Sequence, residues 1–316
     1  MKHFLSLPLF SAAVLLFFSG CRMFEEKTET PSFSGMDFKL IEQGKNTRLF
    51  RHSSGKTLKL FQGKRHCLID GGLFFLPHAV TLDPNGKYQI SPSGMEKVIY
   101  PLFGEKFSPR HEIKTVILDP GHGGDNSGAV GRKHKEKDLN LSLAREIAFS
   151  LEKQGFKVRF TREDDRFLTL EERGAFARKE NGDVFLSIHH NAGGLGSHGV
   201  ETYIVTPCGS ASTNDPATQV HKTAAPGNSC DDQNIHLGSL LQKNMIKQTS
   251  RQDRGVRFAR FRVLVLSTLP GALIEAGFVS HLQEEQSCAL PANQRKIAEA
   301  VTAALVEYNA SIRSGK

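Results

Sequence analysis

From residue 112 onward, segments that favour strands alternate with segments that favour helices, and this alternation limits the fold more than any other feature. Short runs rich in β-branched and apolar residues predict strands at 115–118, 157–161, 184–188, 200–205, 263–266 and 272–275. Amphipathic runs predict helices at 138–154, 170–179, 237–248 and 293–308. Such alternation is typical of a mostly parallel sheet flanked by helices, so we predict an α/β fold for residues 112–312.

The first of these strands ends in a glycine-rich loop that carries a histidine. Residues 119–124 read Asp-Pro-Gly-His-Gly-Gly, which breaks regular structure directly after Leu118. Glycines let the backbone come close to a ligand, and the loop places His122 beyond the end of a buried strand. A lone histidine among glycines is more often a turn residue than a metal ligand, so this loop needs support from elsewhere in the chain.

Other polar residues stand at the ends of further predicted elements. His189 follows the strand at 184–188, Glu275 closes the strand at 272–275, and Glu136 opens the first helix. Ligand sites of open α/β sheets lie beyond the carboxyl ends of the strands, so these side chains are expected to meet His122 there. Two histidines and one carboxylate with an open fourth position form a known type of catalytic zinc site.

His122 and His189, with one of the two carboxylates Glu136 and Glu275, are therefore candidate zinc ligands, and the other carboxylate is a candidate proton carrier. In such a site the metal lowers the pKa of bound water toward about 7. A second carboxylate that does not bind the metal can then carry a proton from water to a leaving nitrogen. These four residues would suffice for metal-assisted amide hydrolysis.

Each assignment has a plainer alternative. Because His190 is adjacent to His189 in the strand, the two side chains point in opposite directions; we prefer His189 because it comes first after the buried run, and His190 fits a supporting or substrate contact. Glu136 also fits an ordinary first-turn glutamate, which the helix dipole favours. Glu275 is harder to explain structurally, since a carboxylate at a buried strand end is costly unless it is paired or used.

Several motifs in register across residues 114–308 resemble the family-3 N-acetylmuramoyl-L-alanine amidases. The resemblance is carried by Asp-Pro-Gly-His-Gly-Gly at 119–124, Glu-Lys-Asp-Leu at 136–139, Thr161-Arg162 with Asp165, Arg173, Ser-Ile-His at 187–189 with Asn191-Ala192, Asp-Arg-Gly-Val at 253–256 and Glu-Ala-Gly-Phe at 275–278.

This resemblance implies a zinc amidase that cleaves the bond between N-acetylmuramic acid and L-alanine of the peptidoglycan stem peptide, in cell-wall remodelling or cell separation. It matches His122, Glu136 and His189 to the zinc ligands and Glu275 to the catalytic glutamate. Peptidoglycan is then the partner, and an activator protein is a further candidate. The alternatives are another zinc-dependent peptidoglycan peptidase or deacetylase, and a non-catalytic wall-binding lipoprotein.

The N-terminal 21 residues have the pattern of an export signal. Lys2 precedes an apolar run from Phe4 to Phe18, which is shorter than the roughly 20 residues of a membrane-spanning helix. Ser19-Gly20 before Cys21 resembles a bacterial lipoprotein signal, so we predict a membrane-anchored lipoprotein of the periplasm or outer cell envelope, with ordinary secretion as the alternative. Residues 22–35 are predicted to be a solvated tether.

The overall charge fits this location. A formal net charge of +8 without interleaved aromatic and basic motifs favours an anionic envelope over nucleic acid as partner. A basic surface with no partner fits equally well.

Residues 36–104 are predicted to be a small β-rich accessory domain. Strands are expected at 48–51, 57–61, 66–69, 73–76 and 87–90, with glycine-containing turns between them, and a short helix is expected at 93–102 with Ser93 as its cap. No chemistry is evident in these residues, so a spacer and a binding module are both open.

The polar stretch 206–236 is the largest insertion. It lacks helical periodicity, so we predict a loop that borders the active-site groove and no inhibitory helix. Cys208 and Cys230 bracket this loop and are the plausible disulfide pair in an oxidising compartment.

Overall fold

A mixed sheet of eleven strands runs through the part of the chain that the computed structural model describes, which is residues 36–104, 111–194, 196–216 and 218–313. The strands lie in the order β1-β2-β3-β4-β5-β14-β11-β15-β10-β8-β9. The export signal and tether predicted for residues 1–35, and with them Cys21, lie outside the described residues. Within the described ranges, no helix is both long and apolar enough to cross a membrane.

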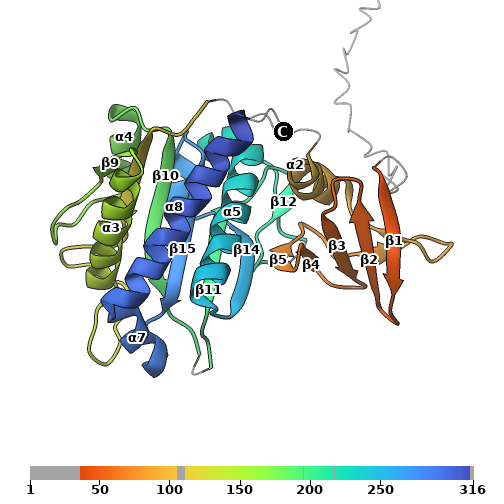
Figure 1. The fold of residues 1–316 in the computed structure, drawn as a ribbon, viewed down its shortest axis with the longest axis horizontal. Helices are drawn as coiled ribbons and strands as arrows, with labels where there is room; N and C mark the ends of the chain where they lie inside the picture. The colour runs from red at the N-terminus through yellow and green to blue at the C-terminus, as the bar shows by residue number, and fades with distance from the viewer. Residues whose placement is uncertain (1–35, 105–110, 195, 217, 314–316) are drawn as a thin grey trace, which may run out of the picture.

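The predicted α/β fold is confirmed for the second part of the chain (Figure 1). Its strands are β8 (Thr115–Pro120), β9 (Lys157–Phe160), β10 (Val184–Asn191), β11 (Val200–Val205), β14 (Asp253–Ala259) and β15 (Gly271–Phe278). Its helices are α3 (Glu136–Lys153), α4 (Leu170–Lys179), α5 (Asp231–Thr249), α6 (Arg262–Leu266), α7 (Leu282–Ala289) and α8 (Pro291–Arg313). Strands β9, β8, β10 and β15 are parallel to one another. Strand β11 pairs antiparallel with β15 and parallel with β14.

Alternate residues of these strands pack on opposite faces of the sheet, as the strand period of two requires. Helices α3, α5 and α8 lie across one face (Figure 1), and residues such as Leu186 and Ile274 join their core. The opposite face packs against α4 and α6 through residues such as Phe185 and Leu273. We call this opposite face the site face, because His189 and Glu275 are an even number of positions from Phe185 and Leu273.

The N-terminal unit, residues 36–104, extends the same sheet and packs into the same core. Its strands are β1 (Phe38–Gln43), β2 (Thr47–His52), β3 (Thr57–Phe61), β4 (His66–Ile69), β5 (Gly72–Phe75), β6 (Thr81–Leu82) and β7 (Tyr88–Gln89), and its helical segments are α1 (Pro92–Gly94), η2 (Met95–Ile99) and α2 (Tyr100–Phe103). Strand β5 joins β14 by parallel pairing of Phe74 with Val256. The core cluster that contains Leu58 and Met95 continues without a break to Leu143 of α3.

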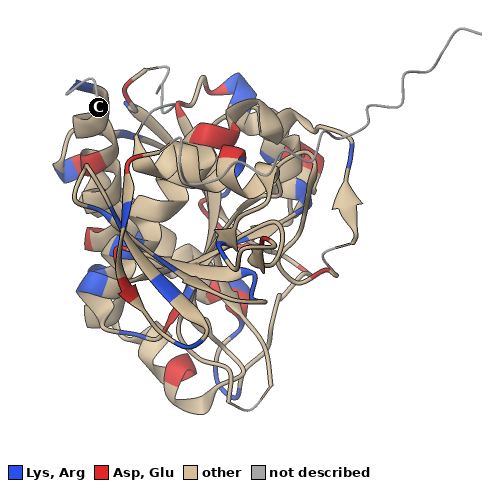
Figure 2. Cartoon of the chain, turned by 90° about the vertical axis from the view of Figure 1, so that its right-hand side faces the viewer, with Lys and Arg blue, Asp and Glu red and all other residues tan. Residues whose placement is uncertain are grey.

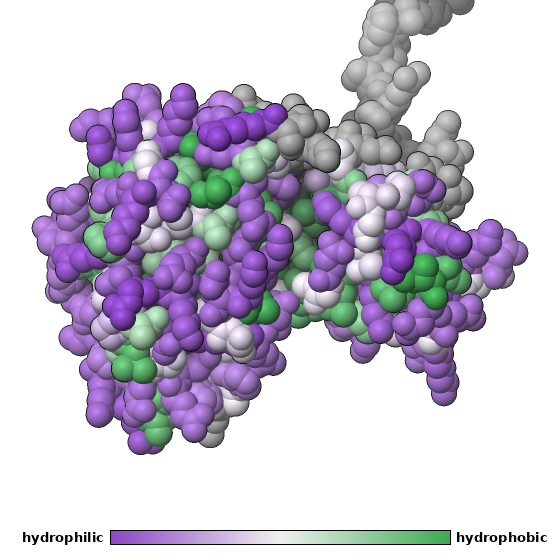
Figure 3. Space-filling model, viewed as in Figure 1, coloured by the Kyte–Doolittle hydropathy of each residue, from purple (hydrophilic) through white to green (hydrophobic). Residues whose placement is uncertain are grey.

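The face of the molecule drawn in Figure 3 is mainly polar, with a hollow at the junction of its two parts. A cavity of about 440 Å³ lies between α5 and the β4–β5 turn, lined by apolar residues such as Leu102 and Leu240. Hydrophobic residues are visible at this junction in Figure 3. In the view from the side of the N-terminal unit, the positions of lysine and arginine along the ribbon are interspersed with those of aspartate and glutamate (Figure 2).

Several local expectations were wrong. Residues 263–266, expected as a strand, form the one-turn helix α6, because Val263 and Leu264 fill the space against α4 on the site face. The helix predicted to start at Ser93 is capped instead by Ser91, whose Oγ accepts from Gly94 N, since Pro92 at the first helical position makes the preceding residue the cap.

The disulfide predicted between Cys208 and Cys230 is absent, and both cysteines are free. The Cys208 thiol donates to Lys222 O at 3.2 Å, while Cys230 is buried with its thiol directed at Thr268 O, 3.6 Å away. The two sulfur atoms therefore contact different parts of the chain, Lys222 and Thr268, and do not pair with each other.

The insertion after β11 is a loop, as predicted, only as far as Cys230; residues 231–236, which were expected to belong to it, form the start of α5 (Asp231–Thr249). Its described residues contain the short strands β12 (Ser210–Ala211) and β13 (Val220–His221) and the single-turn 3-10 helix η3 (Pro226–Cys230). In these described residues no α-helix forms before α5 begins at Asp231.

Candidate metal centre

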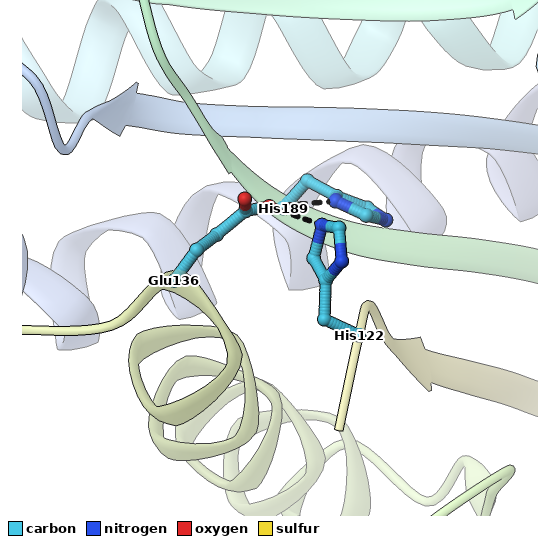
Figure 4. Close-up of side chains that lie close together, drawn as sticks. All are labelled: His122, Glu136 and His189. Carbon is cyan, nitrogen blue, oxygen red and sulfur yellow. Dashed lines mark hydrogen bonds and ion pairs between the residues drawn. The ribbon is translucent and has the colours of Figure 1, made fainter. Parts of the chain in front are cut away.

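The structure brings His122, Glu136 and His189 together at the carboxyl ends of β8 and β10 (Figure 4). Glu136 Oε1 lies 3.1 Å from His122 Nε2 and 2.8 Å from His189 Nδ1. The two imidazole rings are 5.0 Å apart and nearly perpendicular, at 78°. One atom from each residue lies within 4.8 Å of the others, so the three could act as ligands of a single metal ion.

Local backbone geometry explains the glycines of the His122 loop. His122 itself has a φ of +62°, a conformation that is costly for a residue with a side chain and is often found at functional sites. A Cβ on Gly121 would lie 2.1 Å from the His189 ring, and one on Gly128 would lie 2.5 Å from Glu136 Oε2. Side chains at these two positions would therefore fill the space in which the three ligands meet.

Two buried arginines hold the loop in this conformation. Arg162 donates to Pro120 O and Gly121 O at 2.8 Å each, and Arg173 donates to His122 O at 2.7 Å. Arg173 also pairs with Asp119 at 2.7 Å, and both side chains are buried. Charged donors on carbonyl oxygens fix the loop far more firmly than neutral contacts would.

Neighbouring polar groups orient each ligand. Asn126 Oδ1 accepts from Gly128 N, and its 2.9 Å contact with His122 Nδ1 therefore assigns the proton of the imidazole to Nδ1. His122 Nε2 faces Glu136 Oε1 at 3.1 Å, so a cation must lie between these two atoms, either a proton on Nε2 or a metal ion. This arrangement fits a bound divalent metal.

The electrostatics of the cluster agree with this reading. Burial disfavours the charge on Glu136, but hydrogen bonds from His122 and His189 outweigh it and hold the pKa of Glu136 well below its usual value. For His122, burial is the largest single cause and lowers the pKa, but the hydrogen bond with Glu136, the charge of Glu136 and the contact with Asn126 together raise it by more, so the net shift is upward. An anionic carboxylate thus sits between two imidazoles, as a metal site requires.

His190 points away from the cluster to the helix-covered face. Its Nδ1 is 2.8 Å from Asn140 Oδ1 of α3, and complete burial lowers the pKa of His190 to about 3. Asn140 in turn donates to Glu136 Oε1 at 3.3 Å. The neutral His190 therefore supports the metal centre from behind, through Asn140.

Glu275 lies beside the cluster and is not one of its members. It pairs in register with His189 on β10 and, on its other side, with Glu201 on β11. Burial, followed by the charges of Glu136 and Glu201, raises the pKa of Glu275 well above its usual value. Its Oε2 is buried and has no hydrogen-bond partner among the described residues. An unpaired buried carboxyl of this kind is characteristic of a functional group.

With this geometry established, the chain can be compared with known proteins. The family described as N-acetylmuramoyl-L-alanine amidase matches residues 116–307, more than half of the sequence. The chain belongs to this family. The family and the enzyme class predicted from the sequence motifs, a hydrolase, are thereby confirmed.

Individual relatives agree with this membership. The chain is 32% identical over 197 residues to the uncharacterized protein YqiI of Bacillus subtilis, covering 62% of this chain and 85% of YqiI. It is 31% identical over 196 residues to the N-acetylmuramoyl-L-alanine amidase LytC of Bacillus subtilis, covering 62% of this chain but only 35% of LytC. The family resemblance thus concerns the amidase domain and leaves most of LytC unmatched.

A solved structure shows the same fold. The catalytic domain of CwlV, an N-acetylmuramoyl-L-alanine amidase from Bacillus (Paenibacillus) polymyxa var. colistinus, superposes with a TM-score of 0.52 at 30% identity. The match covers 62% of this chain and 98% of that domain. It leaves the N-terminal unit of this amidase family member without a counterpart in the CwlV domain.

Asn126, which contacts the imidazole of His122, was not identified from the sequence. Nor was the ion pair between Arg257 and Glu201, the register partner of Glu275. Asn126 stands four positions after His122 in the glycine-rich loop, and this spacing is a signal that could have been noticed. Glu201 begins an apolar strand and Arg257 lies within another, and neither has a local pattern that marks it.

We expect the Asn126→Ala variant to bind zinc about 10- to 100-fold more weakly, because the His122 ring loses the acceptor that fixes its orientation. Competition with a chromophoric chelator measures this affinity. Asn126→Asp keeps an acceptor oxygen in place and should retain most of the affinity. Equal zinc affinity in Asn126→Ala and the wild type would show that the hydrogen bond is incidental.

Proposed function

We propose that this protein hydrolyses the amide bond between N-acetylmuramic acid and L-alanine of peptidoglycan, with His122, Glu136 and His189 as the ligands of a zinc ion. The observation that supports this most directly is the convergence of three metal-binding side chains beside a buried, unpaired carboxyl group. Membership of the family points to the amide between N-acetylmuramic acid and L-alanine as the bond that is cleaved. The cluster contains the metal-binding and proton-carrying groups that such cleavage needs.

The residues divide the work between binding and proton transfer. When bound, zinc supplies a Lewis acid that polarises the amide and makes water a stronger acid. Glu275 takes a proton from the attacking water, whose oxygen bonds to the lactyl carbonyl carbon. As the carbon–nitrogen bond breaks, Glu275 passes this proton to the L-alanine nitrogen. The raised pKa of Glu275 makes its carboxylate a stronger base toward water than an ordinary glutamate.

The metal centre is reached from solvent. The side chains of His122 and His189 are 24% and 17% exposed, and the described part of the 206–236 loop contains no α-helix before Asp231. We propose that the protein acts in the cell envelope on peptidoglycan. The lipid anchor at Cys21, an activator protein and a role in cell separation remain predictions of the sequence.

Muropeptide analysis tests the reaction. Purified peptidoglycan incubated with the protein should release stem peptides with a free L-alanine amino end, and leave muramic acid with a free lactyl carboxyl, as measured by mass spectrometry. A zinc chelator should abolish this release and added zinc should restore it. New ends within the peptide would indicate a peptidase, free sugar amines a deacetylase, and no new ends a non-catalytic protein.

A further inference from the structure

The N-terminal unit reaches across to the loop that borders the site face. The Arg65 guanidinium, between β3 and β4, donates to four backbone carbonyls of this loop, those of Ala211, Ser212, Thr213 and Asp215, at 2.9–3.5 Å. Its Nε donates to Leu76 O within its own unit at 3.2 Å. From the other side, Thr213 hydrogen-bonds Phe258 of β14 through its backbone and its hydroxyl. The segment 211–215 is thus held between the two parts of the chain.

The same junction encloses Arg257 of β14. Its guanidinium lies over the Phe75 ring of the N-terminal unit, 4.7 Å from the ring centroid, and its Nη2 donates to Asn214 Oδ1 of the held loop at 2.9 Å. Its Nη1 donates to Glu201 Oε2 at 3.1 Å. Arg257 is therefore positioned by a ring and a loop that both depend on residues 36–104.

Glu201 connects Arg257 to the neighbourhood of Glu275. It is buried at 1% exposure, binds both Arg254 and Arg257 through Oε2, and accepts from Asn191 Nδ2 through Oε1 at 2.5 Å. It is also the register partner of Glu275 on the adjacent strand. Because neighbours in register point to the same face of a sheet, the Glu201 and Glu275 carboxyls share one environment.

We propose that the N-terminal unit is part of the catalytic apparatus: Arg65 and Phe75 fix Arg257, and Arg257 fixes the Glu201 carboxylate that flanks Glu275. Arg65, Phe75, Arg257 and Glu201 are positioning residues in this proposal. The proposal rests on the amide hydrolysis proposed above. It replaces a spacer or a wall-binding module as the main role of residues 36–104.

The proposed effect on catalysis follows from the free-energy cost of leaving the buried Glu201 carboxylate without its arginine partner next to Glu275. With its arginines in place, Glu201 is a paired anion whose oxygens are all engaged. If Arg257 moved, the buried Glu201 carboxylate would keep only Arg254 as a charged partner, and its shift toward new contacts would disturb the neighbouring Glu275. Glu275 would then be turned from the reacting atoms, and a displacement of about 1 Å can reduce a rate about 100-fold.

Steady-state kinetics on two substrates tests the proposal. The full chain is compared on a small soluble N-acetylmuramoyl-L-alanyl peptide and on polymeric peptidoglycan. We expect Arg65→Ala and Phe75→Leu to lower kcat by about 10- to 100-fold on both substrates, with KM changed by less than about threefold. Phe75→Tyr keeps the aromatic ring under Arg257, so it should retain the wild-type kcat that Phe75→Leu loses. Zinc content should stay at the wild-type level.

Arg48→Ala is the matched control. Arg48 belongs to the same unit and likewise combines backbone hydrogen bonds, to Gly44 O and Thr47 O, with a position over an aromatic ring, that of Tyr88, but it does not contact the 211–215 segment. Its kcat should be unchanged. Asn214→Ala removes an exposed side chain that meets Arg257, so it gives the same test if Arg65→Ala fails to fold.

Each other outcome overturns the proposal in a distinct way. If Arg65→Ala and Phe75→Leu lost activity on polymeric peptidoglycan alone, the N-terminal unit would be a wall-binding module. If kcat were unchanged on both substrates, the unit would be a spacer. If the wild-type protein hydrolysed neither substrate, the proposed function itself would fail. A decrease of kcat in Arg48→Ala equal to that in Arg65→Ala would indicate general destabilisation of the N-terminal unit and would contradict the positioning role.

Discussion

Replacing Glu275 with glutamine should reduce amide hydrolysis by about 10²- to 10⁴-fold while leaving zinc bound, because the substitution removes the proton carrier and none of the ligands. Glutamine keeps the shape of the side chain but cannot take a proton from water. Turnover of a soluble muramoyl peptide and zinc content by elemental analysis are the two measurements. Glu307→Gln, a substitution in an exposed ion pair with Lys243, is the control and should retain full activity.

The same variant should alter how stability depends on pH. The pKa of Glu275 is raised in the folded protein, so below the unfolded-state pKa the residue is protonated in both states and has no effect. As the pH rises above that value, the unfolded state loses its proton first and is favoured, and the wild-type protein loses stability. With a chelator present, Glu275→Gln should therefore gain stability over the wild type as the pH rises from about 4.5 to 7 in urea unfolding.

Two results would contradict this account of Glu275. Full activity in Glu275→Gln would transfer the proton-carrying role to another group. Loss of zinc together with activity would indicate that the residue shapes the metal centre itself. Either result leaves the three proposed ligands untouched, so the two parts of the site are tested separately.

The sequence predicted that the polar residues of the candidate site would meet, because their signal is local. His122, His189 and Glu275 each stand where a buried apolar run ends, and in a parallel sheet those ends meet at one edge. The period of four residues in α3, from Leu139 to Leu151, likewise predicted which side of that helix is buried. Such features depend on one element and can be recognised without knowing its neighbours.

The remaining features depend on contacts between distant segments. The pairing of β5 with β14 joins positions 182 residues apart, Phe74 with Val256, and no periodicity within either strand indicates it. The Arg65 contacts with residues 211–215 are equally remote in sequence. The short apolar run 263–266 was misassigned for the same reason, since packing against α4 decides between strand and helix at that length.

Glu136→Ala should lose zinc and activity together, because Glu136 Oε1 is the atom at which both histidines converge. Loss of an orienting partner alone weakens a metal site about 10- to 100-fold, and loss of a ligand should exceed that. The substitution also leaves Ala129 N, which donates to Oε2 at 2.8 Å, without its acceptor. Zinc affinity by chelator competition and zinc content after dialysis measure the effect.

The control for this variant is Glu152→Ala, which removes an exposed glutamate from the other end of α3 and should change neither zinc nor turnover. Wild-type zinc affinity in Glu136→Ala would refute the ligand assignment, whatever the activity. High zinc concentration should partly restore hydrolysis in Glu136→Ala if two imidazoles still hold the ion, and it should restore none in Glu275→Gln. That difference in rescue separates the residue that binds the metal from the residue that carries the proton, since only a binding defect can be overcome by mass action.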